Sequence, residues 1–358
     1  MKKIPLLPVV LIAFSFYAAT QFKEPLYGLA CRDFKRIQST DDEVIKNMHT
    51  IIVQLNWSDI QLTEDGSIER DNAADRAIKW VNAFNEKYGT DIGLKIRLYT
   101  GMNSPQWIMN KAGSFGIQDH AFPKFWEDAF IKAFAEVQSK LAAIYDDVPV
   151  VREIVDGGTS TKTAENFIRP FGNSPNATMI NEAFRKAGYT AQADSIAIVK
   201  SFDAMKVWKK TLVSVCFSDW KTLDKNGNVV EDVSRTIPFI KMFIDEFGKQ
   251  AVVGNNGLRP GTGHHGNRWQ EGGDMFAIYQ YFKRIHDEKG IQIYFQTAKD
   301  ERIGNLQDAI NDGIAYGASY IELPGAPRNY MQDLPLSAMA VINKKLKENI
   351  KYFFCSGL

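Results

Sequence analysis

The sequence has few cysteines, no excess of charge of either sign and no repeated or low-complexity segment. Cys31, Cys216 and Cys355 are the only cysteines in 358 residues, and their wide spacing argues against a disulfide framework or a thiolate zinc site. Lys plus Arg number 43 and Asp plus Glu 42, so a net charge of +1 gives no electrostatic case for a nucleic-acid partner. With 45% hydrophobic and 24% charged residues, the chain is expected to fold around a large core.

A long uncharged run occurs only at the N-terminus. Lys2 and Lys3 precede a mostly apolar stretch over residues 4–19, and Ala18-Ala19-Thr20 supplies small residues for cleavage. The run is shorter than the roughly 20 residues that a membrane helix needs. We therefore expect residues 1–20 to be a signal peptide, with no membrane span after its cleavage.

The rest of the chain, residues 21–358, is expected to be the mature domain of a secreted or periplasmic protein. A lipoprotein is the less favoured alternative. Its only support is Gly28-Leu29-Ala30-Cys31, which Lys23 and Glu24 separate from the apolar run.

Apolar runs of strand length alternate with amphipathic, helix-like stretches along the mature domain. Eight runs are predicted strands: 26–31, 50–56, 94–99, 148–155, 212–217, 251–255, 291–296 and 319–323. The predicted helices are 41–47, 73–88, 123–145, 181–186 with 193–210, 234–247, 275–289, 304–316 and 336–349. Eight strands, each followed by a helix, predict a single (β/α)8 TIM barrel.

Two alternatives to this topology follow from the same pattern. An open doubly wound sheet would need a Gly-rich phosphate turn after an early strand, and the sequence has none. If the run 26–31 is not a strand, residues 351–355 would supply the closing strand instead. In a barrel the active site lies where strands end and βα loops begin, so candidate residues are expected there.

Two consecutive predicted strands lead into tryptophan-containing segments. The second strand runs into Asn56-Trp57-Ser58-Asp59, followed by a turn at Asp65-Gly66, and the third runs into Pro105-Gln106-Trp107. This pattern over residues 50–110, with the strand count, resembles clan A glycoside hydrolases, which are (β/α)8 enzymes of the β-galactosidase and endoglucanase type. The resemblance implies hydrolysis of O-glycosidic bonds by two carboxylates, one after the fourth strand and one at the seventh.

The sequence departs from the family pattern at both carboxylate positions. No Asn-Glu pair follows the fourth strand; Asp156 ends it, and Glu165 follows a loop rich in Gly, Thr and Ser. In the seventh strand Gln296 occupies the place of the nucleophile, and a carboxamide cannot perform that role. In the eighth strand Glu322 is a lone carboxylate in an apolar run, and alternation places it with Tyr320 on the inward face.

The candidate catalytic carboxylates are therefore Glu165 as general acid, Glu322 as its partner and Asp156 as a third candidate. The fourth and eighth strands of a barrel lie opposite each other, which predicts the wide separation typical of inverting enzymes. The first two candidates also have a structural interpretation. Glu165 would stabilise a helix N-terminus, and Glu322 would pair with Arg97.

Side chains for substrate binding are expected around the same rim. In the third strand, alternation places Lys95, Arg97 and Tyr99 on one inward face. The predicted binding residues are Trp57, Arg97, Tyr99, Trp107, Asn255, Asn256, Trp269 and Gln296. The loop 255–271 combines amides, imidazoles, Arg and Trp on glycine turns, which suits hydroxyl recognition.

The sequence thus predicts an exported carbohydrate-active hydrolase that acts on an oligo- or polysaccharide and needs no cofactor or metal. One alternative is a catalytically inactive glycan-binding barrel, which Gln296 favours. Another is a metal-dependent hydrolase built on His264 and His265. Adjacent histidines lack the i, i+4 spacing of zinc-binding helices, which argues against that possibility.

Overall fold

The computed structural model describes residues 22–117, 119–261, 268–269, 273–325 and 330–351. The predicted signal peptide, residues 1–20, lies outside the described residues, as do His264 and His265. Within the described ranges, no helix combines the length and the apolar character that a membrane span requires.

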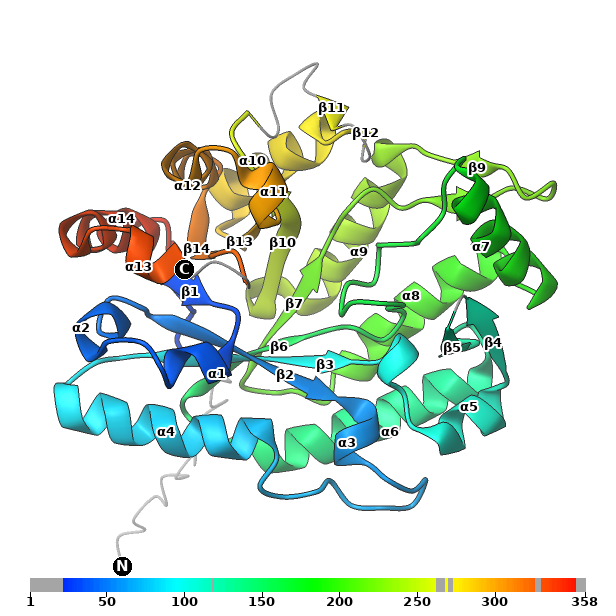
Figure 1. Cartoon of the computed structure of the whole chain (residues 1–358), viewed down its shortest axis with the longest axis horizontal. Helices are drawn as coiled ribbons and strands as arrows, with labels where there is room; N and C mark the ends of the chain where they lie inside the picture. Colours follow the sequence, from blue (N-terminus) through cyan, green and yellow to red (C-terminus); the bar gives the residue numbers. More distant parts are fainter. Residues whose placement is uncertain (1–21, 118, 262–267, 270–272, 326–329, 352–358) are drawn as a thin grey trace, which may run out of the picture.

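Eight parallel strands form a closed barrel in the order β1-β14-β13-β10-β7-β6-β3-β2 (Figure 1). They are β1 (Gly28–Cys31), β2 (Thr50–Asn56), β3 (Gly93–Tyr99), β6 (Val151–Val155), β7 (Leu212–Cys216), β10 (Ala251–Leu258), β13 (Gln292–Thr297) and β14 (Ala318–Glu322). The predicted TIM barrel is confirmed, and each predicted strand is present. Because β1 pairs with both β14 and β2, the barrel closes without residues 351–355.

Helices surround the barrel on its outer face (Figure 1). The longer ones are α4 (Ala73–Tyr88), α6 (Asp128–Tyr145), α7 (Pro175–Lys186), α8 (Ala191–Met205), α9 (Ile237–Phe247), α10 (Phe276–Lys289), α12 (Leu306–Ala315) and α14 (Leu336–Glu348). Shorter helices are α1 (Phe34–Ile37), α2 (Asp42–Ile45), α3 (Trp57–Ile60), α5 (Gln106–Ala112), α11 (Asp300–Ile303) and α13 (Tyr330–Asp333), with 3-10 turns η1 (Gly101–Asn103), η2 (Val233–Thr236) and η3 (Gly248–Gln250).

Within the described residues, three two-stranded antiparallel sheets lie in the loops, and the sequence pattern does not predict them. They are β4 (Ser114–Ile117) with β5 (His120–Pro123), β8 (Thr222–Leu223) with β9 (Val229–Val230), and β11 (Arg268–Trp269) with β12 (Gly273–Asp274). The first hairpin corrects the predicted helix 123–145, because Pro123 ends β5 and the helix begins only at Asp128. The segment that contains Trp107 forms the helix α5, which is not among the predicted helices.

Apolar side chains and two tyrosines fill the lower interior of the barrel. The Tyr294 and Tyr320 rings stack with their centroids 5.2 Å apart and an interplanar angle of 3°. A Cβ atom at Gly254 of β10 would lie 2.3 Å from the Tyr294 ring, so only glycine leaves room for this stack. The tyrosine pair forms a floor beneath the polar residues at the C-terminal ends of the strands.

At the opposite, N-terminal end of the barrel, Lys23 binds the segments that lead into β6 and β7. Its Nζ donates to the backbone carbonyls of Tyr145, Val148 and Val151 at 3.2, 2.8 and 2.6 Å, and to Thr211 Oγ1 at 2.8 Å. Burial is the main cause that lowers the pKa of Lys23 to about 8. These contacts satisfy the ammonium group.

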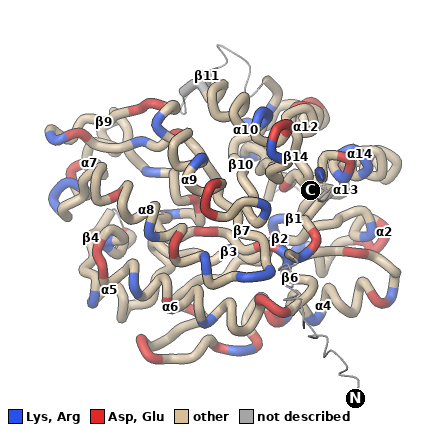
Figure 2. The backbone as a smooth tube through the Cα atoms, turned by 180° about the vertical axis from the view of Figure 1, so that it is seen from behind, with Lys and Arg blue, Asp and Glu red and all other residues tan. Residues whose placement is uncertain are grey.

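The surface carries both signs of charge in mixture. In Figure 2 lysine and arginine alternate with aspartate and glutamate along the helices, and neither sign gathers on one side of the view. This distribution accords with the net charge of +1.

Candidate active site

Four charged side chains from three strands meet inside the barrel. Lys95 Nζ of β3 lies 3.0 Å from Glu153 Oε1 of β6 and 3.1 Å from Glu322 Oε1 of β14. Arg97 Nη2, also on β3, donates to both carboxylate oxygens of Glu322 at 2.9 Å. The predicted inward alternation of Lys95, Arg97 and Glu322 is confirmed, and so is the predicted Arg97–Glu322 pair.

Glu322 is held as an ionised carboxylate. Burial alone would raise its pKa, but the charges of Arg97, Lys95 and Arg32 outweigh that effect and lower the pKa to about 2. Arg32 Nε lies 3.5 Å from Glu322 Oε2. Glu322 therefore provides a fixed negative charge at neutral pH and cannot act as a proton donor there.

The tyrosine floor completes this ion cluster. Tyr320 OH donates to Glu153 Oε1 at 2.6 Å and accepts from Lys95 Nζ at 2.8 Å. The same Nζ lies 3.4 Å from the centroid of the Tyr294 ring, a cation–π contact. Each of these charged groups thus has an oppositely charged partner, and the tyrosines add a hydrogen bond and a ring contact. Glu153 Oε2 has no hydrogen-bond partner among the described residues.

Glu165 lies in the connection between β6 and α7, and it is only 5% exposed. Its Oε2 is buried and has no hydrogen-bond partner among the described residues. The negative charge of Glu165 acts on Arg32, Arg97 and Tyr99, and after burial it is the largest influence on the Cys216 thiol. The loop therefore folds back over the mouth of the barrel and brings a buried carboxylate near Arg32 and Arg97.

Asp156 anchors the start of this loop and faces the helix layer. Its Oδ1 accepts from Gly158 N at 2.9 Å and its Oδ2 from Ser201 Oγ of α8 at 2.8 Å. Burial raises the pKa of Asp156 to about 6, against the opposing effect of these donors. The position departs from the expectation of a carboxylate in the barrel mouth, because Asp156 has the opposite parity to the inward-facing Glu153.

The loop is also fixed by close contact with the turn after β3. Thr100 Oγ1 donates to the Gly157 carbonyl at 2.7 Å, and Met102 N donates to the Thr161 carbonyl at 3.1 Å. Gly101 has φ +53°, and a Cβ there would lie 1.9 Å from Thr161 O. The turn requires glycine at Gly101 for both conformation and space.

Several predicted binding residues are gathered at the rim. Tyr99 ends β3, Asn256 lies near the end of β10, and Gln296 near the end of β13; each is half-buried. Arg97 Nη2 donates to Gln296 Oε1 at 3.4 Å, so Gln296 adjoins the ion cluster. Burial is the main cause that raises the pKa of Tyr99, which keeps its hydroxyl protonated at neutral pH.

Other predicted binding residues lie elsewhere. Trp57 is 0% exposed, and its Nε1 donates to Gln61 Oε1 at 2.9 Å, so the indole packs in the core. Asn255 is buried, donates to the Phe217 carbonyl at 2.9 Å and accepts from Tyr279 OH at 2.9 Å. Both placements correct the expectation of a ligand contact, because buried side chains with satisfied polar groups are not available to a substrate.

Of the two other predicted binding tryptophans, Trp107 and Trp269, only Trp107 has a described side chain. Trp107 is half-buried on α5, and its Nε1 donates to the Gln61 carbonyl at 3.2 Å. Its ring packs edge-on against Trp57 with centroids 5.8 Å apart. Trp269 belongs to β11, and its side chain lies outside the described residues.

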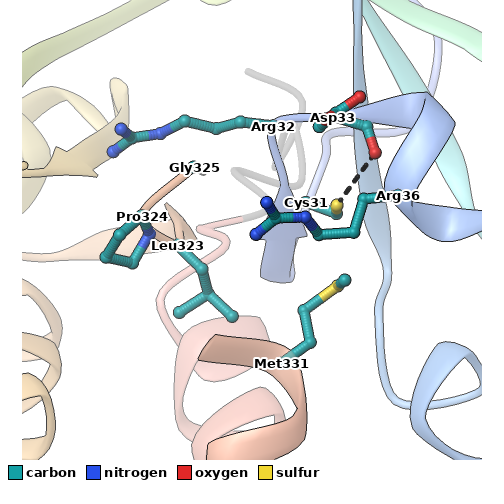
Figure 3. A pocket seen from close by; sticks show the side chains of 8 residues that line it. All are labelled: Cys31, Arg32, Asp33, Arg36, Leu323, Pro324, Gly325 and Met331. Atoms are coloured by element: carbon teal, nitrogen blue, oxygen red, sulfur yellow. Dashed lines mark hydrogen bonds between the residues drawn. The ribbon is translucent and has the colours of Figure 1, made fainter. Parts of the chain in front are cut away.

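Arg32 is a site residue that the sequence reasoning missed. It follows β1 with the inward parity of Ala30, and its Nη2 donates to the carbonyls of Thr297 and Glu322 at 2.6 and 3.1 Å. Alternation continued by one residue beyond the strand would have identified it. Arg32 is among the residues that line a hollow of about 10 Å³, room for about one water molecule. Figure 3 shows these residues, which come from the segment β1–α1, from α13 and from the segment after β14.

In the part of the chain that the structure describes, no group of three or more His, Cys, Asp or Glu side chains is arranged to hold a metal ion. The site therefore offers carboxylates, guanidinium groups, a phenol and amides. Such groups can transfer protons and bind hydroxyl groups.

Comparison with known proteins finds similarity in fold only. No family model matches the chain, and no curated protein matches its sequence. The catalytic domain of β-amylase from Paenibacillus polymyxa aligns with a TM-score of 0.57 at 10% identity, over 93% of this chain and 100% of that one.

Two β-galactosidases share the fold as well. The cold-adapted enzyme from Rahnella sp. R3 has a TM-score of 0.52 over 92% of this chain, and that of Marinomonas ef1 has 0.50 over 90%, each at 10% identity. This chain spans 58% of the length of each. The chain therefore has the (β/α)8 fold found in glycoside hydrolases, and the resemblance predicted from the sequence is confirmed at the level of fold.

Proposed function

We propose that the protein hydrolyses O-glycosidic bonds of an oligo- or polysaccharide, with Glu165 as the general acid. The observation that carries the proposal is the buried carboxylate of Glu165, whose Oε2 has no described partner at the mouth of the barrel. A buried carboxylate in a TIM-barrel mouth has the position that proton transfer to a bound substrate requires. The shared fold with a β-amylase and β-galactosidases supports a carbohydrate substrate.

In this mechanism Glu165 protonates the oxygen of the leaving group while the bond to the anomeric carbon breaks. Glu322 stays ionised and fixes the Arg97 guanidinium beside Gln296 at the rim. Tyr99, Asn256 and Gln296 provide hydroxyl and amide groups at the rim for hydrogen bonds to sugar hydroxyls.

Export is part of the same proposal. The positive residues Lys2 and Lys3 and the uncharged run behind them support cleavage near residue 20 and a secreted or periplasmic location. N-terminal sequencing of the protein from its native host tests this. A start near residue 21 supports export, and an intact Met1 on cytoplasmic protein overturns it.

The test of activity compares the parent with E165Q on a panel of aryl glycosides and polysaccharides. A positioned general acid is worth about 10²–10⁴-fold, so we expect E165Q to lose turnover by that factor with an unchanged melting temperature. The control is E136Q, a substitution of an exposed glutamate on α6, which should leave turnover unchanged. Full turnover by E165Q would refute the assignment. A parent that binds oligosaccharide without hydrolysing it would indicate a glycan-binding barrel instead.

A further inference from the structure

A second buried carboxylate lies at the same end of the barrel, beyond β7. Asp219 is 5% exposed, and neither of its carboxylate oxygens has a hydrogen-bond partner among the described residues. The other described carboxylates with a buried, unpartnered oxygen are Glu165 at the rim and Glu153 inside the barrel. Glu165 and Asp219 are carried by the loops after the neighbouring strands β6 and β7.

We propose that Asp219 is the catalytic base that acts with Glu165 in this hydrolysis. The inference rests on the proposed function and assigns the second carboxylate of the reaction. Glu322 is less suited to proton transfer because both its oxygens accept from Arg97, and Lys95 and Arg32 lie beside them. The buried oxygens of Asp219 accept no hydrogen bond from any described residue, so a water molecule can bind to them.

One buried aspartate holds the two loops together. Asp194 of α8 is 0% exposed, and its Oδ2 accepts from Arg169 Nε at 3.1 Å and from Trp220 Nε1 at 3.1 Å. Arg169 lies four residues after Glu165, and Trp220 directly follows Asp219. Each carboxylate is thereby attached, through a near neighbour in sequence, to the same rigid helix.

Contacts with β7 place Glu165 on the side of the mouth from which Asp219 emerges. Glu165 is the charge that most affects Cys216, the last residue of β7. Two residues beyond Glu165, the ring of Phe167 packs on that of Phe217 with centroids 5.0 Å apart. Asp219 follows Phe217 by only two residues, so the loops that carry the two carboxylates are in contact with each other.

The chemistry needs no component beyond substrate and water. The Glu165 carboxyl proton passes to the glycosidic oxygen as the bond from the anomeric carbon to that oxygen breaks. A water oxygen forms the new bond to the anomeric carbon, and Asp219 accepts the proton that this water loses. A free sugar and the leaving alcohol result, and solvent returns a proton to Glu165 and removes one from Asp219.

The environment of Asp219 suits this role. Burial is the main cause that raises its pKa to about 6, so it is ionised at pH 7 and can accept a proton. The charged groups that act on it are Lys221 and Arg235, which lower its pKa, and Glu231 and Asp232, which raise it. A base of this kind predicts that kcat/KM of the parent falls as the pH drops below about 6.

The experiment compares D219N, E165Q and the control D245N on the aryl glycoside or polysaccharide that the parent hydrolyses. Asp245 is exposed on α9, pairs with Lys241 and is not among the charges that act on Asp219, so D245N should keep parental turnover. We expect D219N to lose about 10²–10⁴-fold in kcat, to melt no lower than the parent, and to lose the acidic limb of the kcat/KM profile.

Each outcome separates this inference from the function on which it rests. If E165Q is inactive and D219N keeps parental turnover with the same acidic limb, Asp219 is not the base while the hydrolase assignment stands. If D219N loses activity only because it is unfolded, circular dichroism and melting will show it, and D219E, which restores a carboxylate, must then recover both folding and the acidic limb. A folded D219E without that limb overturns the inference, and a parent without turnover overturns both proposals.

Discussion

The interior and the rim of the barrel both bury carboxylates, but they treat them in opposite ways. Inside, Glu322 is surrounded by Arg97, Lys95 and Arg32, and its pKa is lowered to about 2. At the rim Asp219 has no hydrogen-bond partner among the described residues, and its pKa is raised to about 6. Burial raises the pKa in both cases, so the converging cations decide the direction. Several close cations keep a buried carboxylate ionised, whereas a buried carboxylate on which burial dominates can exchange a proton near neutral pH.

Removing the charge of Glu322 should have the largest effect on stability. E322Q leaves Arg97 and Lys95 without their shared counterion inside the barrel, which should cost about 3–5 kcal/mol in the free energy of unfolding at pH 7. Chemical denaturation of E322Q beside E136Q measures it, and the exposed control should remain within about 0.5 kcal/mol.

The pH dependence checks the sign of this effect. The folded pKa of Glu322 lies below its ordinary value of 4.5, so its stabilisation is present above pH 4.5 and is lost as the pH falls toward 2. The difference between parent and E322Q should therefore shrink in acid. A constant difference would mean that packing, and not charge, is responsible.

The interior could be predicted from sequence because strands obey a strict period of two. Arg97, Glu322 and Tyr320 lie within strands, so parity alone placed them inside, and the need of a buried charge for a partner suggested the Arg97–Glu322 pair. The barrel itself followed from eight regularly spaced runs. The interior thus depends on local geometry that the sequence displays.

The rim could be predicted only in part, because parity fails where strands end. Asp156 and Asn255 lie at the ends of predicted strands, where site residues are expected. The strand alternation, however, turns both side chains toward the surrounding helices. Trp57 begins α3 directly after β2, and this turn directs its ring into the core. The path of the loop that brings Glu165 back to the mouth depends on contacts with Thr100 and Met102, which no sequence period encodes.

The contact between Gly101 and the loop that carries Glu165 can be tested by substitution. In G101A the new Cβ would lie 1.9 Å from the Thr161 carbonyl, so the loop carrying Glu165 must shift. An alanine side chain also disfavours the positive φ of this position. From the clash and this conformational cost together, we expect a loss of about 3 kcal/mol in the free energy of unfolding and reduced turnover.

Gly89 provides the matched control for this substitution. It also has a positive φ, +64°, but nothing lies within 4 Å of a Cβ built there. G89A should therefore cost only the conformational part, about 1–2 kcal/mol, without loss of turnover. Equal melting temperatures for G101A and G89A would show that the contact between the two loops is not tight.

Asp156 is an intermediate case between interior and rim, and it should give the smallest effect. Its donors are neutral and include Gly158 N and Ser201 Oγ, and its pKa is raised to about 6 from an ordinary value of 3.8. The folded state therefore binds more protons than the unfolded state between those values, and Asp156 makes the protein less stable as the pH rises through this window.

D156N keeps an acceptor for Gly158 N and removes the buried charge. We expect D156N to be more stable than the parent by about 1–3 kcal/mol at pH 7.5, and nearly equal to it at pH 4. Urea denaturation at the two pH values measures the difference. A D156N protein that is destabilised equally at both would show that the hydrogen bond from Ser201 outweighs the cost of burying the charge, and would group Asp156 with the compensated carboxylates of the interior.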